Sequence, residues 1–215
     1  MALGFTKSSG GSADFLPIIK FDARAGRIFR VDREDGVSTP HDITRNFRAV
    51  FDFENVEMGY INFDTGSAPD FQMVSMEEWV ENKPKPPSDK HREGFRMRVR
   101  LSKECGGDLR ELSGTSAALR EGIDSLHDDY MSGLSKNAGK LPVVSLEDTV
   151  GRESGGKNGI KSTNYQPVFK IVSWVDRPKD MERKAAPQKE ERSAPLTGST
   201  RAKPPIMDDD EDFGN

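Results

Sequence analysis

Residues 94–102 read GFRMRVRLS, and their strict alternation is typical of a β-strand. In such a strand successive side chains point to opposite faces, so apolar residues fall on one face and arginines on the other. The apolar face needs a core to cover it, and the basic face predicts a row of positive charge at the surface. The apolar set is Phe95, Met97, Val99 and Leu101, and the basic set is Arg96, Arg98 and Arg100.

Shorter runs upstream of residue 94 also predict strands. They are LPIIKF (16–21), RIFRVD (27–32), NFRAVFDF (46–53) and MGYINF (58–63). The third run places Phe47, Ala49, Phe51 and Phe53 on one face, and the fourth follows it closely enough to pair with it. The run 71–80 fits either a strand or a helical turn, and the prolines of 81–90 predict a break.

After residue 108 the apolar period lengthens from two to about three and a half, which predicts one amphipathic helix from 109 to about 132. Asp108 and Glu111 fit its N-cap and the partner three residues later. Two closing strands are expected at 141–146 and 166–175, joined by a loop rich in Gly and Lys (151–163). The helical stripe is Leu109, Leu112, Ser116, Leu119, Ile123, Leu126 and Tyr130.

The order of strands, one late helix and two further strands predicts a mainly β domain over residues 14–176. It fits an elaborated OB-fold, which is a five-stranded Greek-key barrel, here with extra strands in its first half. A small mixed α+β sandwich fits the same order of elements.

Outside 14–176 the chain lacks apolar periodicity. Residues 1–13 are rich in Gly and Ser and are expected to form a flexible arm. Residues 177–207 carry eight basic and four acidic residues and are expected to form a disordered linker, and 208–215 form an acidic tail. The acids of the tail are Asp208, Asp209, Asp210, Glu211 and Asp212, and Phe213 follows them.

The overall composition is 33% hydrophobic and 32% charged, and no window holds the roughly 18 apolar residues that cross a bilayer. The start of the chain has no pattern of a secretory signal, so we expect a soluble protein of the cytoplasm. Cys105 is the only cysteine, which excludes an intramolecular disulfide. With His41, His91 and His127 it forms no metal-ligand spacing, so neither a metal nor another cofactor is expected.

Residues 151–158, GRESGGKN, differ from the phosphate-binding pattern GxxxxGK[ST] at the last position. That position supplies the hydroxyl for magnesium, and the pattern also needs a helix to start there, whereas the sequence continues into a strand. A loop between the last two strands is therefore the preferred interpretation. Because the sequence also shows no catalytic constellation, we do not expect an enzyme.

Basic residues alternate with aromatic residues through the predicted strands. Cations that follow phosphates and rings that stack on bases are what sequence-independent binding of a single strand requires. A solvated face balanced by acids is the alternative for the arginine row. The candidate DNA-binding residues are Arg27, Arg30, Arg48, Tyr60, Arg96, Arg98, Arg100, Lys157, Lys161, Tyr165, Lys170 and Trp174.

The acidic tail with its Phe resembles the C-terminal tails of bacterial and phage single-stranded DNA-binding proteins, and NYQPVFKIVSWVDRP (164–178) resembles the final strand of the phage type. The resemblance implies an OB-fold that coats single-stranded DNA in replication, recombination or repair, in a bacterial cell or a phage-infected host. It also implies that Asp208 to Asp212 and Phe213 recruit a polymerase, helicase or primase. Self-association is left open. The alternative is a scaffolding or chaperone-like protein that uses the acidic tail on a basic client.

Overall fold

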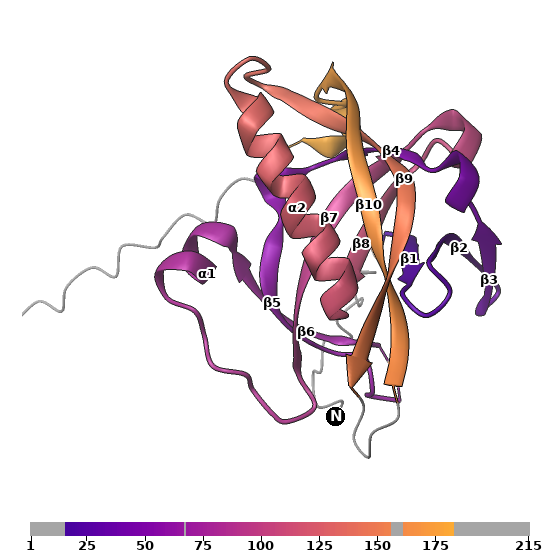
Figure 1. Ribbon diagram of the computed structural model, residues 1–215, viewed down its shortest axis with the longest axis vertical. Coiled ribbons are helices and arrows are strands. Elements are labelled where there is room, and N and C mark those ends of the chain that lie inside the picture. Colours follow the sequence, from indigo (N-terminus) through magenta and orange to yellow (C-terminus); the bar gives the residue numbers. More distant parts are fainter. Residues whose placement is uncertain (1–15, 67, 156–160, 183–215) are drawn as a thin grey trace, which may run out of the picture. The chain divides into compact units, whose positions relative to one another are not determined.

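The computed structural model describes residues 16–66, 68–155 and 161–182, which form a mainly β domain (Figure 1). Within these ranges ten strands share one sheet that does not close; β1 and β8 are parallel, and the other pairs are antiparallel. The strands are β1 (Ile18–Asp22), β2 (Arg27–Glu34), β3 (Val37–Asp42), β4 (Arg48–Phe51), β5 (Glu57–Asn62), β6 (Asp70–Ser75), β7 (Arg92–Leu101), β8 (Leu109–Gly114), β9 (Lys140–Gly155) and β10 (Lys161–Asp176). The helices are α1 (Met76–Glu81) and α2 (Ala117–Leu134), with 3-10 turns η1 (Thr44–Asn46), η2 (Phe53–Asn55), η3 (Lys103–Cys105) and η5 (Lys179–Met181).

Strand β7 lies at the centre of the sheet. One of its edges pairs with β8, from Phe95 opposite Gly114 to Arg100 opposite Leu109. The other edge is shared, because residues 92–96 pair with β5 and residues 99–101 pair with β4. The predicted alternation is confirmed: the four apolar side chains of β7 are at most 2% exposed. We call their side of the sheet the inner face and the opposite side the outer face.

Strands β4 and β5 diverge from this shared edge. The 3-10 turn η2 follows β4 and carries the chain away from the β4 ladder. The prediction that 46–53 pairs with 58–63 is wrong, since β4 pairs with β7 and β9 while β5 pairs with β6 and β7. The predicted face of the third run is confirmed, because Phe47, Ala49, Phe51 and Phe53 are all buried.

Helix α2 covers the inner face of the sheet (Figure 1). Its N-cap is Ser116, whose Oγ accepts a hydrogen bond from the Leu119 N–H at 3.3 Å. Leu119, Ile123, Leu126 and Tyr130 form its buried stripe and join the core that contains the apolar face of β7. The helix therefore closes the core from the side opposite to the arginine row.

The predicted start of this helix at Leu109 is wrong, because residues 109–114 form β8. Their alternation turns Arg110, Leu112 and Gly114 inward, whereas the predicted helical stripe starts with Leu109 and Leu112, which lie on opposite faces of β8. Asp108, the predicted N-cap, instead binds the guanidinium of Arg110.

The closing strands β9 and β10 form a hairpin that is longer than predicted. Each strand has 16 residues, and their register runs from Gly155 opposite Lys161 to Lys140 opposite Asp176. Most of the predicted loop 151–163 is therefore strand. In Figure 1 the hairpin runs along the domain beside α2, and the pairings place it at one end of the sheet.

The first half of the sheet ends in the hairpin of β2 and β3. Asp35 and Gly36 form its turn with φ angles of 48° and 80°, a backbone that Asp-Gly supports. Strand β3 was not predicted, since its sequence VSTPHD is polar and contains Pro40. Pro is tolerated there because β3 is an edge strand.

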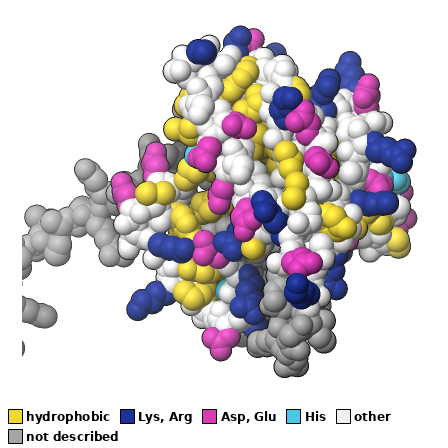
Figure 2. All heavy atoms as spheres, in the orientation of Figure 1, with side chains coloured by type: hydrophobic (Ala, Val, Ile, Leu, Met, Phe, Trp, Pro, Cys, Tyr) yellow, Lys and Arg dark blue, Asp and Glu magenta, His cyan; other side chains and the backbone are white. Residues whose placement is uncertain are grey.

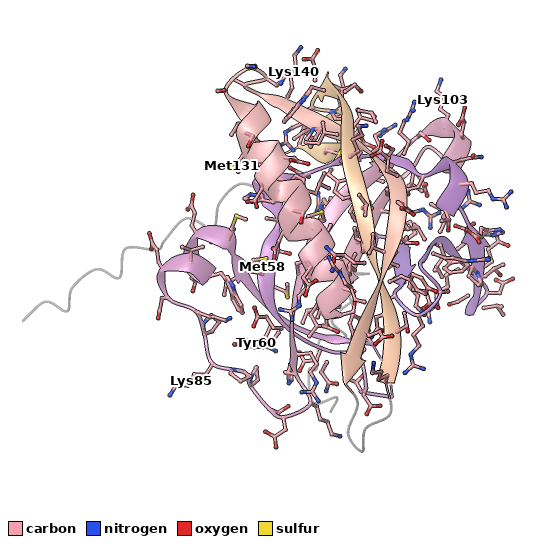
Figure 3. All side chains as sticks on the ribbon, viewed as in Figure 1. Met58, Tyr60, Lys85, Lys103, Met131 and Lys140 are labelled. Atoms are coloured by element: carbon pink, nitrogen blue, oxygen red, sulfur yellow. The ribbon has the colours of Figure 1, made fainter. Side chains whose placement is uncertain are left out.

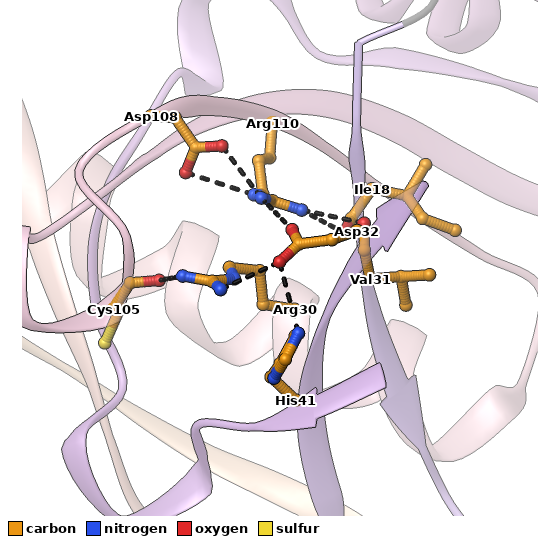
Figure 4. A network of polar contacts seen from close by, with 8 residues as sticks. All are labelled: Ile18, Arg30, Val31, Asp32, His41, Cys105, Asp108 and Arg110. Atoms are coloured by element: carbon orange, nitrogen blue, oxygen red, sulfur yellow. Dashed lines mark hydrogen bonds and ion pairs between the residues drawn. The ribbon is translucent and has the colours of Figure 1, made fainter. Parts of the chain in front are cut away.

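A buried arginine joins β8 to β1 and β2 (Figure 4). The Arg110 side chain is 5% exposed and donates to the carbonyl oxygens of Ile18 and Val31 and to the carboxylates of Asp32 and Asp108. Asp32 also binds Arg30 at 2.8 Å, and His41 Nε2 lies 3.3 Å from it. Strands β1, β2 and β3, which we call the β1–β3 unit, thus each contribute at least one group to this ion cluster.

The ion pairs of this cluster change the acidity of Asp32. Burial by itself would raise the pKa of Asp32, but its hydrogen bonds and charge interactions with Arg110 and Arg30 outweigh burial and lower the pKa below the ordinary value of 3.8. The folded domain therefore favours the ionised carboxylate.

The fold continues past Asp176 through a short strap, residues 177–182. The Arg177 guanidinium binds both carboxylate oxygens of Asp52, at 2.9 and 3.1 Å, and Glu54 at 2.6 Å. Burial would lower the pKa of Arg177, but these two acids outweigh it and raise the pKa. Met181 is fully buried. Residues from the expected linker thus complete the domain, while most of the linker, residues 183–207, lies outside the described ranges.

No helix in residues 16–66, 68–155 and 161–182 combines the length and apolar character that crossing a membrane requires. No group of three or more His, Cys, Asp and Glu side chains within the same ranges is arranged to hold a metal ion.

We expect Asp32→Asn to lower the free energy of unfolding by about 2 to 3 kcal/mol, because it leaves buried Arg110 with a single carboxylate partner. Urea unfolding followed by circular dichroism measures the change. Asp35→Asn is the matched control: it removes the same charge in an exposed turn whose positive φ suits Asn, and it should change stability by less than about 0.5 kcal/mol. Equal losses in the two variants would contradict the role of the cluster.

The same variant predicts an acid dependence. Because the pKa of Asp32 is lowered on folding, its contribution to stability is complete above about pH 3.8 and is lost as the pH falls through the folded-state pKa. The difference in unfolding free energy between the natural chain and Asp32→Asn should therefore shrink as urea titrations move to lower pH below 3.8. A difference that stays constant there would contradict this linkage.

Candidate nucleic-acid interface

The outer face of β7 carries the predicted row of arginines. Arg96, Arg98 and Arg100 alternate with the four buried apolar residues, so the strand itself fixes their common direction. All three are partly exposed. One ten-residue strand thus aligns three guanidinium groups on a single side of the sheet.

The register adds two cations from neighbouring strands to this face. Arg48 on β4 lies opposite Ser145 on β9, which lies opposite Lys170 on β10. The next outward position of β4, Val50, lies opposite Arg100. Arg48 and Lys170 are both exposed. We call Arg48, Arg96, Arg98, Arg100 and Lys170 the basic face.

Acidic side chains accompany most of the basic face. Glu57 lies 2.6 Å from Arg96, Asp180 from the strap pairs with Arg100, and Arg98 lies opposite Glu111 in the register. The two ion pairs keep the guanidinium groups of Arg96 and Arg100 in place on the sheet surface.

Lys170 pairs with Glu147 at 2.7 Å across the β9–β10 hairpin. Its hydrogen bond to this carboxylate, together with the negative charge, raises the pKa of Lys170. Both side chains are more than half exposed, so the pair contributes little to stability. Lys170 is therefore charged at neutral pH and can exchange one anionic partner for another.

The other basic candidates lie elsewhere on the sheet. Arg27 is on the outer face of β2, three strands from β7 by way of β8 and β1, and pairs with Asp42. Arg30 lies opposite buried Ile19 and turns inward to the cluster of Figure 4. Lys161 binds Glu153 at the exposed end of the hairpin. Lys157 and the tail residues 208–213 lie outside the described ranges.

The aromatic candidates are used mainly for packing. Tyr60 is 8% exposed, and its hydroxyl donates to the carbonyl oxygen of Pro84. Together with Met58 it projects from β5 toward the side that carries α1 and α2 (Figure 3). Trp174 stacks on Tyr130 of α2, with ring centroids 5.6 Å apart. None of these rings lies on the basic face.

Tyr165 is tied to the β1–β2 turn. Its backbone N–H donates to the carbonyl oxygen of Ala23 at 2.6 Å. A Cβ atom at Gly26 would lie 3.1 Å from the Tyr165 side chain, and the Gly26 φ of 66° also favours glycine. The Tyr165 side chain therefore lies close to the β1–β2 turn on at least one side.

Two aromatic residues that the sequence did not single out lie next to the basic face. The Arg96 guanidinium lies over the Phe71 ring, 5.2 Å from its centroid, and Phe63 contacts Phe71 edge to face at 6.2 Å. The sequence predicts a strand that includes Phe63 and leaves the segment of Phe71 ambiguous between a strand and a helical turn. Only the pairing of β6 with β5, and of β5 with β7, brings them to Arg96.

The opposite side of β5 carries a pocket of about 290 Å³ between α1 and α2. Glu93, Asp124 and Arg120 are its charged lining residues, and the two helices beside it carry seven acids and one arginine. Figure 2 shows hydrophobic side chains interspersed with both acidic and basic ones on this side of the molecule. The lining residues are Phe53, Val56, Met58, Met76, Trp79, Val80, Glu93, Phe95, Arg120, Ile123, Asp124 and His127.

One short chain of hydrogen bonds has the residue types of a hydrolytic triad. Ser88 Oγ lies 2.8 Å from His91 Nδ1, and His91 Nε2 lies 3.1 Å from Asp70. Ser88 and His91 belong to one turn, in which Ser88 Oγ also accepts from the Lys90 N–H. None of the three residues lines the pocket between α1 and α2. The arrangement is therefore that of a turn held to β6.

Comparisons of this chain with protein-family models, with curated proteins and with solved structures found no match.

Proposed function

We propose that this protein binds single-stranded DNA through its basic face and coats it during replication, recombination or repair, without catalysing a reaction. The observation that carries the proposal is the row of Arg96, Arg98 and Arg100 on one strand, extended sideways by Arg48 and Lys170 through the sheet register. A continuous line of cations can follow a phosphate backbone and needs no base sequence to do so.

The carboxylates on this face are compatible with the proposal. The pairs of Arg100 and Lys170 are exposed, and exposed ion pairs contribute at most about 1 kcal/mol. When a phosphate replaces Asp180 or Glu147 as the partner of the cation, little ion-pair free energy is therefore lost. The release of counterions from the DNA then favours binding. The presence of these acids is also compatible with DNA binding that depends strongly on salt concentration.

The chain order also supports an elaborated OB-fold. If β4 and β5 together count as the first strand, β7 and β8 are the second and third, α2 follows, and β9 and β10 are the fourth and fifth. The face of the second and third strands and the loop between the last two are where such folds bind oligonucleotides. The arginine row would then lie on the second strand, at the expected place.

For the tail, the proposal rests on sequence. Five acids followed by Phe213 combine long-range attraction to a basic partner with one ring that can be buried, which suits docking of a polymerase, helicase or primase.

A second candidate is a scaffolding or chaperone-like protein with a basic client. The apolar pocket between α1 and α2, with its acidic surroundings, favours it. In that function replacement of the arginine row would leave client binding unchanged.

We expect Arg96→Gln, Arg98→Gln and Arg100→Gln together to weaken binding of labelled oligo-dT by at least about 30-fold at low salt, because three phosphate contacts are lost. The slope of log affinity against log salt should fall in magnitude by about 2, at about 0.7 for each contact to a single strand. Fluorescence anisotropy at several salt concentrations measures both quantities.

The matched control replaces Lys85, Lys136 and Lys140 with Gln, which removes equal charge at exposed positions off the basic face. It should retain most of the affinity. If the two triple variants lose affinity equally, the interface is placed wrongly, and if the natural chain does not bind oligo-dT, the proposed function is wrong.

Removal of the acids should have the opposite effect. We expect Glu147→Gln with Asp180→Asn to tighten oligo-dT binding by roughly threefold or more, because Lys170 and Arg100 no longer have to leave a carboxylate. Glu121→Gln with Asp128→Asn on α2 is the control for net charge. An equal gain in both double variants would show a general charge effect instead of local competition.

A further inference from the structure

Phe63 and Phe71 differ from most of the other phenylalanines that the structure describes. Six of the other seven, including Phe51 and Phe95, are buried in the core, and Phe29 is half-buried on β2. Phe63 is 49% exposed, and Phe71 is half-buried on β6 beside it. Neither ring is therefore fully buried in the core, and both expose surface on which another planar group can stack.

These rings lie on the same side of the sheet as the basic face. Glu57 on β5 lies opposite Arg96 on β7, and Ile61, four residues further along β5, lies opposite Phe71 on β6. Residues an even number apart on a strand share a face, so Phe71 points outward with Arg96. The cation–π contact of 5.2 Å between them confirms this direction.

We propose that Phe63 and Phe71 form a stacking platform for the bases of a single strand whose phosphates follow Arg96, Arg98 and Arg100. This inference rests on the proposed function and names the part of the site that contacts bases. Every base has a π-face, so stacking on an aromatic ring adds affinity without sequence preference. Arg96 already lies against the Phe71 ring, and a base that stacks there has its phosphate within reach of this guanidinium.

The aromatic candidates from the sequence do not offer this combination. Tyr60 is buried, and Trp174 is stacked on α2. Tyr165 lies against the β1–β2 turn. Trp79, which is not one of these candidates, lies on α1 with Lys83 over its ring, 4.6 Å from the centroid, on the side of β5 that faces the pocket. The position next to the arginine row is held by Phe71 and Phe63.

The test compares oligo-dT with an abasic oligonucleotide of equal length, which has the same phosphates and no bases. The natural chain should bind oligo-dT more tightly. In Phe63→Leu with Phe71→Leu, which keeps apolar volume and removes the rings, affinity for oligo-dT should fall about tenfold. Affinity for the abasic strand and the salt slope should not change, because no phosphate contact is lost.

Phe63→Leu alone, at an exposed position, should give part of the loss and keeps the test valid if the double variant alters the circular dichroism spectrum. Val80→Ala with Met131→Ala is the control, since both side chains are exposed apolar groups on the helices (Figure 3 labels Met131). It should leave both affinities unchanged.

The outcomes separate the two proposals. If the affinity for oligo-dT depends on the arginine row but does not change in the leucine variants, the stacking platform is wrong and the proposed function stands. Equal affinity of the natural chain for the two strands would also overturn the platform. If the natural chain binds neither strand, both proposals fail.

Discussion

The central strand β7 is the constraint on which the other parts of the domain depend. Its four apolar residues must be covered, so α2 and the rings of β4 pack against its inner face. The pleat then leaves its arginines no direction except outward. Its edge is long enough for two partners, and η2 lets β4 and β5 share it. Through β4 the sheet continues to the long hairpin, and through β5 it continues to β6. The arrangement of cations and rings on the outer face thus follows from how one strand is paired.

The two helices carry mostly acids, whereas the outer face of the sheet carries cations together with acidic partners. Helices α1 and α2, on the inner side, carry seven acids and one arginine, while Arg48, Lys170 and the arginine row lie on the outer face. The β1–β3 unit is joined to β8 by parallel pairing and by the buried cluster around Arg110. The strap ties the last strand to β4 and η2 through Arg177 and Asp52. Both ends of the described domain are therefore held by arginines that make several contacts each, and the proposed interface lies between them.

Local patterns predicted local features well. The alternation in 94–102 gave a strand with the correct two faces, and the phenylalanines of 46–53 are buried as expected. The helix start was placed too early because Leu109 and Leu112, three residues apart, fit a helical stripe, whereas in β8 they lie on opposite faces, and only pairing with β7 decides between the two structures. Strand β3 was missed because edge strands need no apolar alternation, although Asp35-Gly36 is a hairpin signal. Arg48 and Lys170 were predicted as binding residues, yet their shared row depends on the register of β4, β9 and β10. Phe63 and Phe71 could not be assigned, since 25 residues separate Arg96 from Phe71 in the chain.

The most direct test of the account is photo-crosslinking of an oligonucleotide with 5-bromodeoxyuridine to the full chain, followed by mapping of the modified peptides. Crosslinks should fall in residues 92–101, in the β5–β6 hairpin and in the outward positions of β4 and β10, and excess unlabelled oligo-dT should abolish them. Crosslinks confined to α1 and α2, or none above the background of a duplex of the same sequence, would contradict the claim that the outer face of β7 binds single-stranded DNA.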